Sequence, residues 1–139
     1  HELLDSAIWR RFQTVIEMPK PELAEVASMI KNMPEFIDVS QIKPGQWKKV
    51  YDALLGLSYS DIKNILNNMV KKLVLKDENK VKFTDILVEA YLFKNHGNYT
   101  MEQMVQYMID HGVSQKQASL YFNVSTRQIK NCLERSEKN

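Results

Sequence analysis

The chain has 139 residues, of which 44% are hydrophobic and 26% charged, and its formal net charge is +2. This size suits one compact domain, or two very small ones that share a core. Its single cysteine, Cys132, excludes an intrachain disulfide scaffold, and no apolar run approaches the roughly 18 residues of a membrane span.

The N-terminal residues carry no signal-peptide pattern, and a lone cysteine suits a reducing compartment. We therefore expect a cytoplasmic protein without a membrane partner. Because the chain begins at His1 rather than Met, we expect a tag remnant or a piece of a longer protein.

Charge is distributed unevenly along the chain. Residues 1–42 carry a net charge of −3, residues 43–82 carry +5, residues 83–112 carry −3 and residues 113–139 carry +3. Two basic blocks are typical of a protein that meets a polyanion with two of its surfaces. Lysines that merely solvate helices would give the same pattern, so charge alone leaves both interpretations open.

The N-terminal segment, residues 1–42, is predicted to be helical and acidic. A first helix over 3–17 has an apolar face. The members of this face are Leu3, Leu4, Ile8, Trp9 and Phe12. Because such a face needs a covering surface, we expect homodimerisation through these N-terminal helices, or contact with another protein, here.

A second helix is predicted from Pro21, and a connector over 33–44 with a short extended piece at 36–39 follows it. The expected inward residues of this helix are Leu23, Val26, Ala27 and Ile30. A third helix follows Gly45, and its apolar stripe consists of Trp47, Val50, Tyr51 and Leu54.

A fourth helix is predicted to begin after Ser58, where Ser58 and Asp61 have the spacing of a capping box, and to end near Lys72. Its expected inward residues are Ile62, Ile65, Leu66 and Met69. Residues 73–83 then alternate apolar and polar side chains around the turn-rich triplet 77–79, which predicts a β-hairpin.

The order of helix, tight turn, helix and basic hairpin in residues 43–95 resembles a winged-helix domain with a linking buried helix. The resemblance implies that the second helix enters the major groove of DNA and that the hairpin follows the backbone. The DNA contacts it implies are Lys63, Asn64, Asn67, Lys71, Lys72, Lys76, Lys80 and Lys82. Winged helices also bind proteins, so this resemblance leaves both kinds of partner open.

Residues 84–94 predict a helix that is apolar on nearly all sides, interrupted only by Glu89 within the run from Ile86 to Phe93. Such a helix is buried on most sides. We expect it to be the central rod that joins the two halves of the molecule.

Three short helices are predicted at about 100–111, 115–122 and 126–136, within a C-terminal unit over 96–139. Each begins with a hydroxyl residue followed three positions later by Gln, the pattern of a capping box. These pairs are Thr100 and Gln103, Ser114 and Gln117, and Ser125 and Gln128. Gly112 and Asn123 occupy the points where helices must stop.

Residues 117–133 resemble the helix-turn-helix of DNA-binding proteins, especially the Fis-like and homeodomain-like trihelical kind. Ala118 supplies a small residue where the helices cross, and Val124 fills the turn. The residues expected to point inward are Leu120, Ile129 and Leu133. Asn123 stands where the family usually has Gly, a mild departure because Asn also tolerates the left-handed backbone.

By this resemblance, the helix beginning at Ser125 is the recognition helix that reads the major groove. The contacts implied there are Ser125, Thr126, Arg127, Gln128, Lys130 and Asn131, flanked by Gln115, Lys116 and Lys138. Arg pairs with guanine, and Gln or Asn pairs with adenine, through two hydrogen bonds. The alternative is a structural trihelical module with a merely polar outer face.

Motifs of enzymes and metal sites are absent from the sequence. The three histidines and Cys132 lack the spacing of metal ligands, and the four glycines form no phosphate-binding loop. We expect no catalytic residues, metal or cofactor. Cys132 and the regularly spaced Met101, Met104 and Met108 are interpreted as packing residues.

The sequence therefore predicts a mainly α protein in which one β-hairpin, winged-helix-like, precedes a C-terminal trihelical helix-turn-helix. Its expected function is sequence-specific binding of double-stranded DNA as a nucleoid-associated transcription regulator. Three alternatives stay open. One is an accessory DNA-binding protein of replication or partition, and another is a helical protein–protein adaptor that does not bind DNA. The third is a small-molecule sensor with a pocket lined by the apolar helix over 86–93, although no convergent set of polar residues marks such a pocket.

Overall fold

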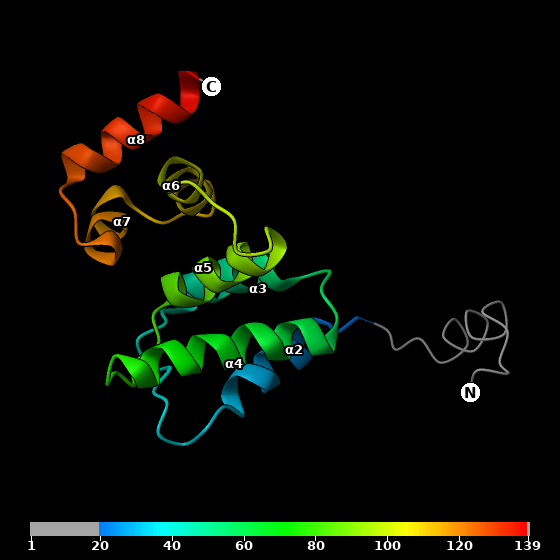
Figure 1. Ribbon diagram of the computed structural model, residues 1–139. Helices are drawn as coiled ribbons and strands as arrows, with labels where there is room; N and C mark the ends of the chain where they lie inside the picture. Colours follow the sequence, from blue (N-terminus) through cyan, green and yellow to red (C-terminus); the bar gives the residue numbers. More distant parts are fainter. Residues whose placement is uncertain (1–19, 139) are drawn as a thin grey trace, which may run out of the picture.

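A computed structural model describes residues 20–138 of the chain, which form seven helices (Figure 1). In chain order these are α2 (Leu23–Lys31), α3 (Pro44–Leu54), α4 (Tyr59–Leu75), α5 (Phe83–Lys94), α6 (Met101–Asp110), α7 (Gln115–Phe122) and α8 (Thr126–Lys138). The expectation of a mainly α protein is confirmed. The predicted helix over 3–17, with its apolar face, lies outside the described residues.

Helix α5 is the central element, packed against α3 and α4 on one side and against α6 on the other (Figure 1). Its buried residues are Phe83, Thr84, Ile86, Leu87, Val88, Glu89 and Ala90. Glu89 is the exception in this apolar set, and it pairs with Lys72 of α4. The burial predicted for this helix is confirmed.

Helices α2, α3 and α4 surround α5 much as the apolar spacing predicts. Val26 and Ile30 of α2 are fully buried, and so are Val50 and Leu54 of α3. The inward residues predicted for α4 are all buried. Leu23 was wrongly expected to point inward: it begins α2 and is 51% exposed.

The predicted β-hairpin over 73–83 is wrong, because α4 continues through Leu75. Leu73 lies one helical turn beyond Met69 on the same stripe and is buried with it, so packing favours another turn of helix. The helix ends at Leu75, and Asp77 shortly after it adopts the left-handed backbone conformation, at φ 56°.

The segment between α4 and α5 does not pair with residues 73–76, as the predicted hairpin requires. It pairs with the chain near Asp38 instead. Within residues 20–138 the strand-like pairing is a single parallel bridge between Asp38 and Lys80, in which the Asp38 N–H donates to the Asn79 carbonyl at 2.7 Å. The winged-helix architecture is therefore corrected to a helical bundle, α2–α5.

Helices α6, α7 and α8 form the predicted trihelical unit. Each of the three capping boxes is present, with the hydroxyl of Thr100, Ser114 or Ser125 accepting from the N–H three residues later at 3.1–3.2 Å. Asn123 adopts the left-handed conformation between α7 and α8, at φ 55° and ψ 48°. Ala118 and Ile129 are fully buried and Cys132 nearly so, as expected for packing residues.

Candidate nucleic-acid interface

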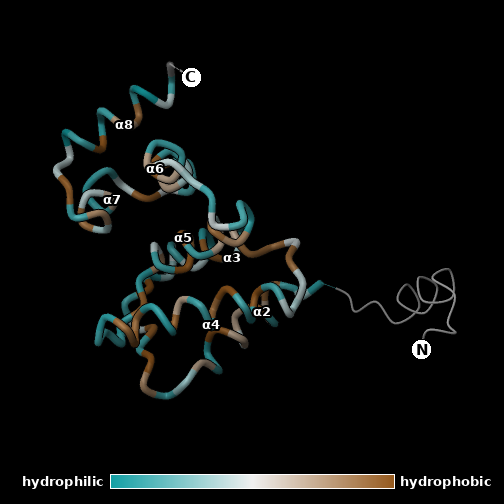
Figure 2. The backbone as a smooth tube through the Cα atoms, in the orientation of Figure 1, coloured by the Kyte–Doolittle hydropathy of each residue, from teal (hydrophilic) through white to brown (hydrophobic). Residues whose placement is uncertain are grey.

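Helix α8 presents one uncovered polar face. Arg127, Lys130, Asn131 and Glu134 recur at helical spacing along it, and all four are exposed. The opposite face carries the buried Ile129 and packs on α6 and α7. Figure 1 shows α8 as the outermost helix, with α6 and α7 between it and the bundle, and Figure 2 shows it mainly in the hydrophilic colour.

Two of the predicted DNA contacts, Ser125 and Gln128, form the capping box at the start of α8. The Gln128 side-chain oxygen accepts from the Ser125 N–H at 2.8 Å, while the Ser125 hydroxyl accepts from the Gln128 N–H at 3.2 Å. These two side chains therefore fix the geometry of the helix end. The exposed side chains that this leaves for contact are those of Thr126, Arg127, Lys130 and Asn131.

The first turn of α7 lies in the same unit. Lys116 is exposed, whereas Gln115 is half-buried. Leu120 was wrongly expected to point inward, because it is 71% exposed. Ala118 and Ser119 occupy the buried face of this short helix, and Leu120 lies outside that face.

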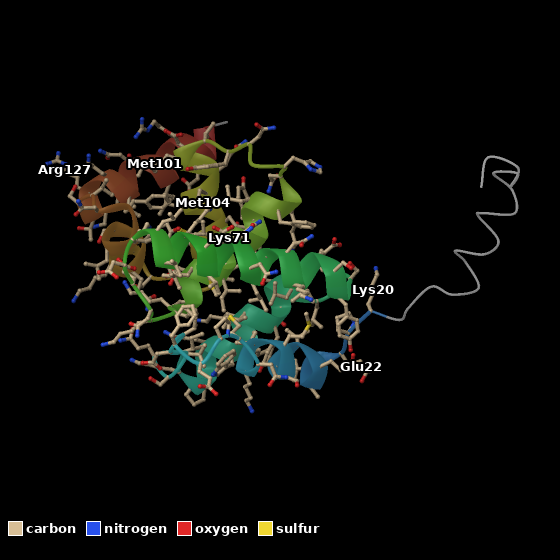
Figure 3. All side chains as sticks on the ribbon, turned by 60° about the horizontal axis from the view of Figure 1, so that its bottom comes forward. Lys20, Glu22, Lys71, Met101, Met104 and Arg127 are labelled. Atoms are coloured by element: carbon tan, nitrogen blue, oxygen red, sulfur yellow. The ribbon has the colours of Figure 1, made fainter. Side chains whose placement is uncertain are left out.

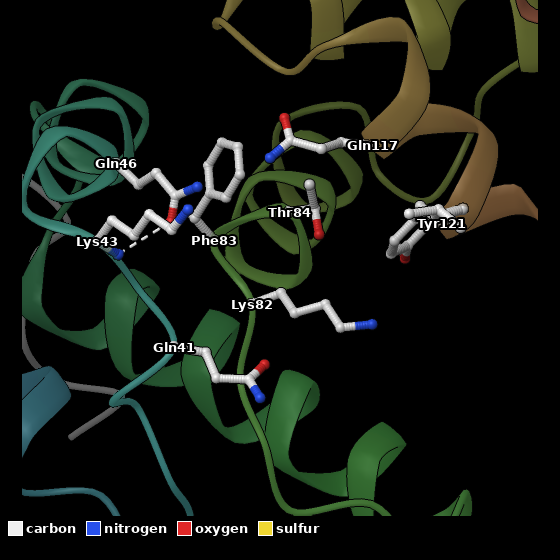
Figure 4. Close-up of a pocket in the computed structure, with 9 residues that line it drawn as sticks. Gln41, Lys43, Gln46, Lys82, Phe83, Thr84, Gln117 and Tyr121 are labelled. Carbon is white, nitrogen blue, oxygen red and sulfur yellow. Dashed lines mark hydrogen bonds between the residues drawn. The ribbon is translucent and has the colours of Figure 1, made fainter. Parts of the chain in front are cut away.

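Leu120 borders a hollow of about 220 Å³ between α7 and the bundle (Figure 4). The bundle contributes Gln41, Lys43, Gln46, Lys82, Phe83 and Thr84, and α7 contributes Gln117, Leu120 and Tyr121. No carboxylate lines this hollow among the described residues. Lys43 and Lys82 precede α3 and α5 directly, so the positive ends of two helix dipoles add to their charge.

Tyr121 of α7 lies beside residues of the bundle. It lines a small cavity together with Lys76, Asp85 and Glu89. Burial raises the pKa of the Tyr121 hydroxyl, and the nearby Asp85 and Glu89 carboxylates raise it further. The fold thus places Lys76 and Lys82, both expected on a β-hairpin, beside α7 instead.

Lys80 lies between α4 and α5, in the same segment as Lys82, and is exposed. Hydrogen bonding from the Ser40 side chain and backbone, with the nearby Lys80 ammonium, lowers the pKa of the Asp38 carboxyl. Since Asp38 is ionised at neutral pH, it offsets part of the positive charge of Lys80.

The remaining predicted contacts on α4 lie elsewhere. Lys63, Asn67 and Lys71 line a groove between α4 and α2, and Asn64 is exposed on the same helix. Figure 3 shows Lys71 and Arg127 on separate parts of the molecule. The structure therefore groups Lys76 and Lys82 with α7 and separates them from Lys63 and Lys71.

Neither Lys43 nor the hollow that it borders is predicted from the sequence motifs. The signal that was available is the pair of residues Lys43 and Pro44, a typical start of a helix. Its closeness to α7 depends on contacts between segments about 70 residues apart, which local patterns do not reveal.

No described helix is long and apolar enough to cross a membrane. Within residues 20–138, no group of three or more His, Cys, Asp or Glu side chains is arranged to hold a metal ion.

No known family profile matches the sequence, and no solved structure matches it. The chain is similar to a protein of Sinorhizobium fredii described as an uncharacterized AAA family ATPase, with 28% identity over 86 residues. This stretch covers 59% of the chain but only 24% of the relative. Because the match covers more than half of the 139 residues, it must include the middle of the chain, where α4 lies.

Proposed function

We propose that this protein binds double-stranded DNA and reads base sequence with the outer face of α8. The observation that carries the proposal is the position of Arg127, Lys130 and Asn131 on one uncovered helical face, at the edge of a trihelical unit. A guanidinium and an amide at this spacing suit the base edges of the major groove. Ser125 and Gln128 support the proposal by fixing the end of the helix that would enter the groove.

The basic residues around α7 suit the phosphate backbone. Lys116 is exposed on α7, and Lys76 and Lys82 approach the same helix from the bundle. Backbone contacts of this kind orient a protein on the duplex without reading its sequence. We therefore assign sequence specificity to α8 and much of the affinity to the lysines beside α7.

The test is selection from a random duplex library, with affinities measured at about 50 and about 200 mM salt. The proposal expects enrichment of one motif and affinity that falls steeply with salt. Arg127→Ala should relax the preference at one base pair by about 1–3 kcal/mol, since it removes one bidentate contact.

Arg135→Ala is the matched control, because Arg135 lies on the same helix but its guanidinium forms an ion pair with the Glu102 carboxylate of α6, at 3.4 Å. It should leave the selected motif unchanged. Equal losses on specific and random duplexes for Arg127→Ala would remove this residue from base recognition. Failure to retain any duplex at low salt would favour the protein–protein adaptor instead.

Regulation of transcription is the use we propose for such binding. The position of the enriched motif in the source genome separates this use from replication or partition. Occurrences beside promoters support a regulator, whereas a cluster at an origin of replication supports the accessory role.

A part in an ATP-driven protein is a second candidate, favoured by the similarity to the AAA family ATPase. Because the four glycines form no phosphate-binding loop, we do not expect these 139 residues to hydrolyse ATP. Titration of the chain with a fluorescent ATP analogue tests one form of this candidate, in which the chain itself binds nucleotide. Saturable binding would mean that the chain itself takes part in nucleotide recognition.

A further inference from the structure

A surface groove of about 500 Å³ lies between α2 and α4, on a part of the bundle away from the trihelical unit. Its lining comes from the end of α2 with the turn that follows it, and from one face of α4. The proposed DNA-binding function does not use this groove.

The floor of the groove is apolar and adaptable. Met29, Met33 and Val70 are half-buried, and Leu66 is buried beneath them. Flexible methionine side chains fill irregular gaps and repack around different apolar groups. An apolar floor of this kind suits side chains from another protein and does not suit the phosphates of nucleic acid.

One rim of the groove is positively charged. Lys63, Asn67 and Lys71 follow one another at intervals of four residues along α4, and all three are exposed. Neither lysine forms an ion pair with another residue in the described part of the chain, and no carboxylate lines the groove there. Its charge is therefore available to an acidic partner.

We propose that this groove binds an amphipathic helix of a partner protein, one whose apolar stripe is flanked by Asp or Glu. The apolar stripe would lie on Met29, Met33 and Val70, as in other complexes that seat a helix in a groove. The flanking carboxylates would pair with Lys63 and Lys71, and this charge complementarity sets the preference among partners.

The experiment is selection from a displayed library of helical peptides of about four turns, with a fixed apolar stripe and randomised flanking positions. The immobilised protein is the full 139-residue chain. Asp and Glu should be enriched over Lys and Arg at the flanking positions. Fluorescence anisotropy should then show that the best peptide binds at least about tenfold tighter than its counterpart with Lys in place of each acid.

Charge reversal on the rim provides the decisive variant. The double change Lys63→Glu and Lys71→Glu should invert the selection, so that Lys and Arg become enriched. The matched control is Lys48→Glu on α3, an exposed lysine outside the groove, which should retain the acidic preference. Circular dichroism confirms that each variant is folded.

Three results would overturn the proposal. These are the absence of any enriched peptide, the same flanking preference in the parent and the double variant, and equal effects of the double variant and Lys48→Glu. Sedimentation equilibrium tests whether a second copy of the chain occupies the groove. A dimer of the parent chain that the double variant abolishes would also overturn the proposal, because it would assign the groove to a second copy.

Discussion

Tyr107 of α6 carries the buried hydroxyl that has no hydrogen-bond partner among the described residues. Its ring lies 4.7 Å from that of Tyr91 and 4.0 Å from that of His111, measured between centroids. Burial raises the pKa of Tyr107 to about 12, and the nearby Tyr91 hydroxyl contributes to this shift. A buried hydroxyl without a partner costs stability, because unfolding returns it to water.

Tyr107→Phe should therefore raise the free energy of unfolding at pH 7 by about 1 kcal/mol, since it removes the unpaired oxygen and keeps the ring. Urea unfolding followed by circular dichroism measures the difference. A loss of stability of similar size would show that the hydroxyl makes a favourable interaction in solution.

The same substitution should change the response to alkaline pH. Between the ordinary tyrosine pKa of about 10 and the folded-state pKa of about 12, the unfolded chain loses this proton while the folded chain keeps it. The free energy of unfolding of the parent protein therefore falls as the pH rises through this window. Because Tyr107→Phe lacks this contribution, its advantage should widen from pH 9 to pH 12.

Single residues show where spacing arguments succeed and fail. Ala118 and Leu120 lie two positions apart on α7, and the family resemblance predicts both to be inward. The structure buries Ala118 and exposes Leu120, because residues two positions apart lie on nearly opposite sides of a helix. Residue type alone does not reveal that Leu120 borders a hollow.

At the scale of elements, local signals predict the trihelical unit well. Its three helix starts depend on side chains three residues apart, and these hydrogen bonds form within one turn. The hairpin fails for the opposite reason. Alternation over residues 73–83 is also compatible with a last helical turn, and the burial of Leu73 against the bundle decides between them.

The crossing of α7 and α8 provides a direct test of this packing. Ala118→Leu should lower the free energy of unfolding by about 1–3 kcal/mol, because the added carbons have no space where the helices approach. Leu120→Ala should change it by less than about 0.5 kcal/mol, since the side chain is 71% exposed. Thermal or urea unfolding of the two variants compares them. A larger loss for Leu120→Ala would restore the inward position that the resemblance implies.

At the scale of the whole molecule, long-range contacts fix the trihelical unit on the bundle. The Lys49 ammonium of α3 donates to the Gly112 carbonyl at 2.9 Å, and Tyr107 packs on Tyr91 of α5. The apolar composition of residues 84–94 alone predicts that this helix is buried at the centre of the molecule. It does not predict which lysines approach α7, since that depends on these contacts between distant segments.

This arrangement separates the basic residues of the bundle into two surfaces. Lys76 and Lys82 lie beside α7, because each lines a cavity that Tyr121 of α7 also lines. Lys63 and Lys71 border the groove between α2 and α4. Since we propose phosphate contacts for the first pair and not for the second, the two surfaces should respond differently to substitution.

Lys82→Ala should weaken binding to all duplexes alike and reduce the slope of log affinity against log salt by about 1, because one phosphate contact releases about one counterion. Lys63→Ala removes the same charge from the chain but lies on the groove, so the slope should stay that of the parent protein. Titrations at several salt concentrations, on one specific and one random duplex, distinguish these effects. Slopes that fall equally in the two variants would show that only the net charge of the protein matters. A reduced slope for Lys63→Ala alone would place the duplex along α4, across the groove.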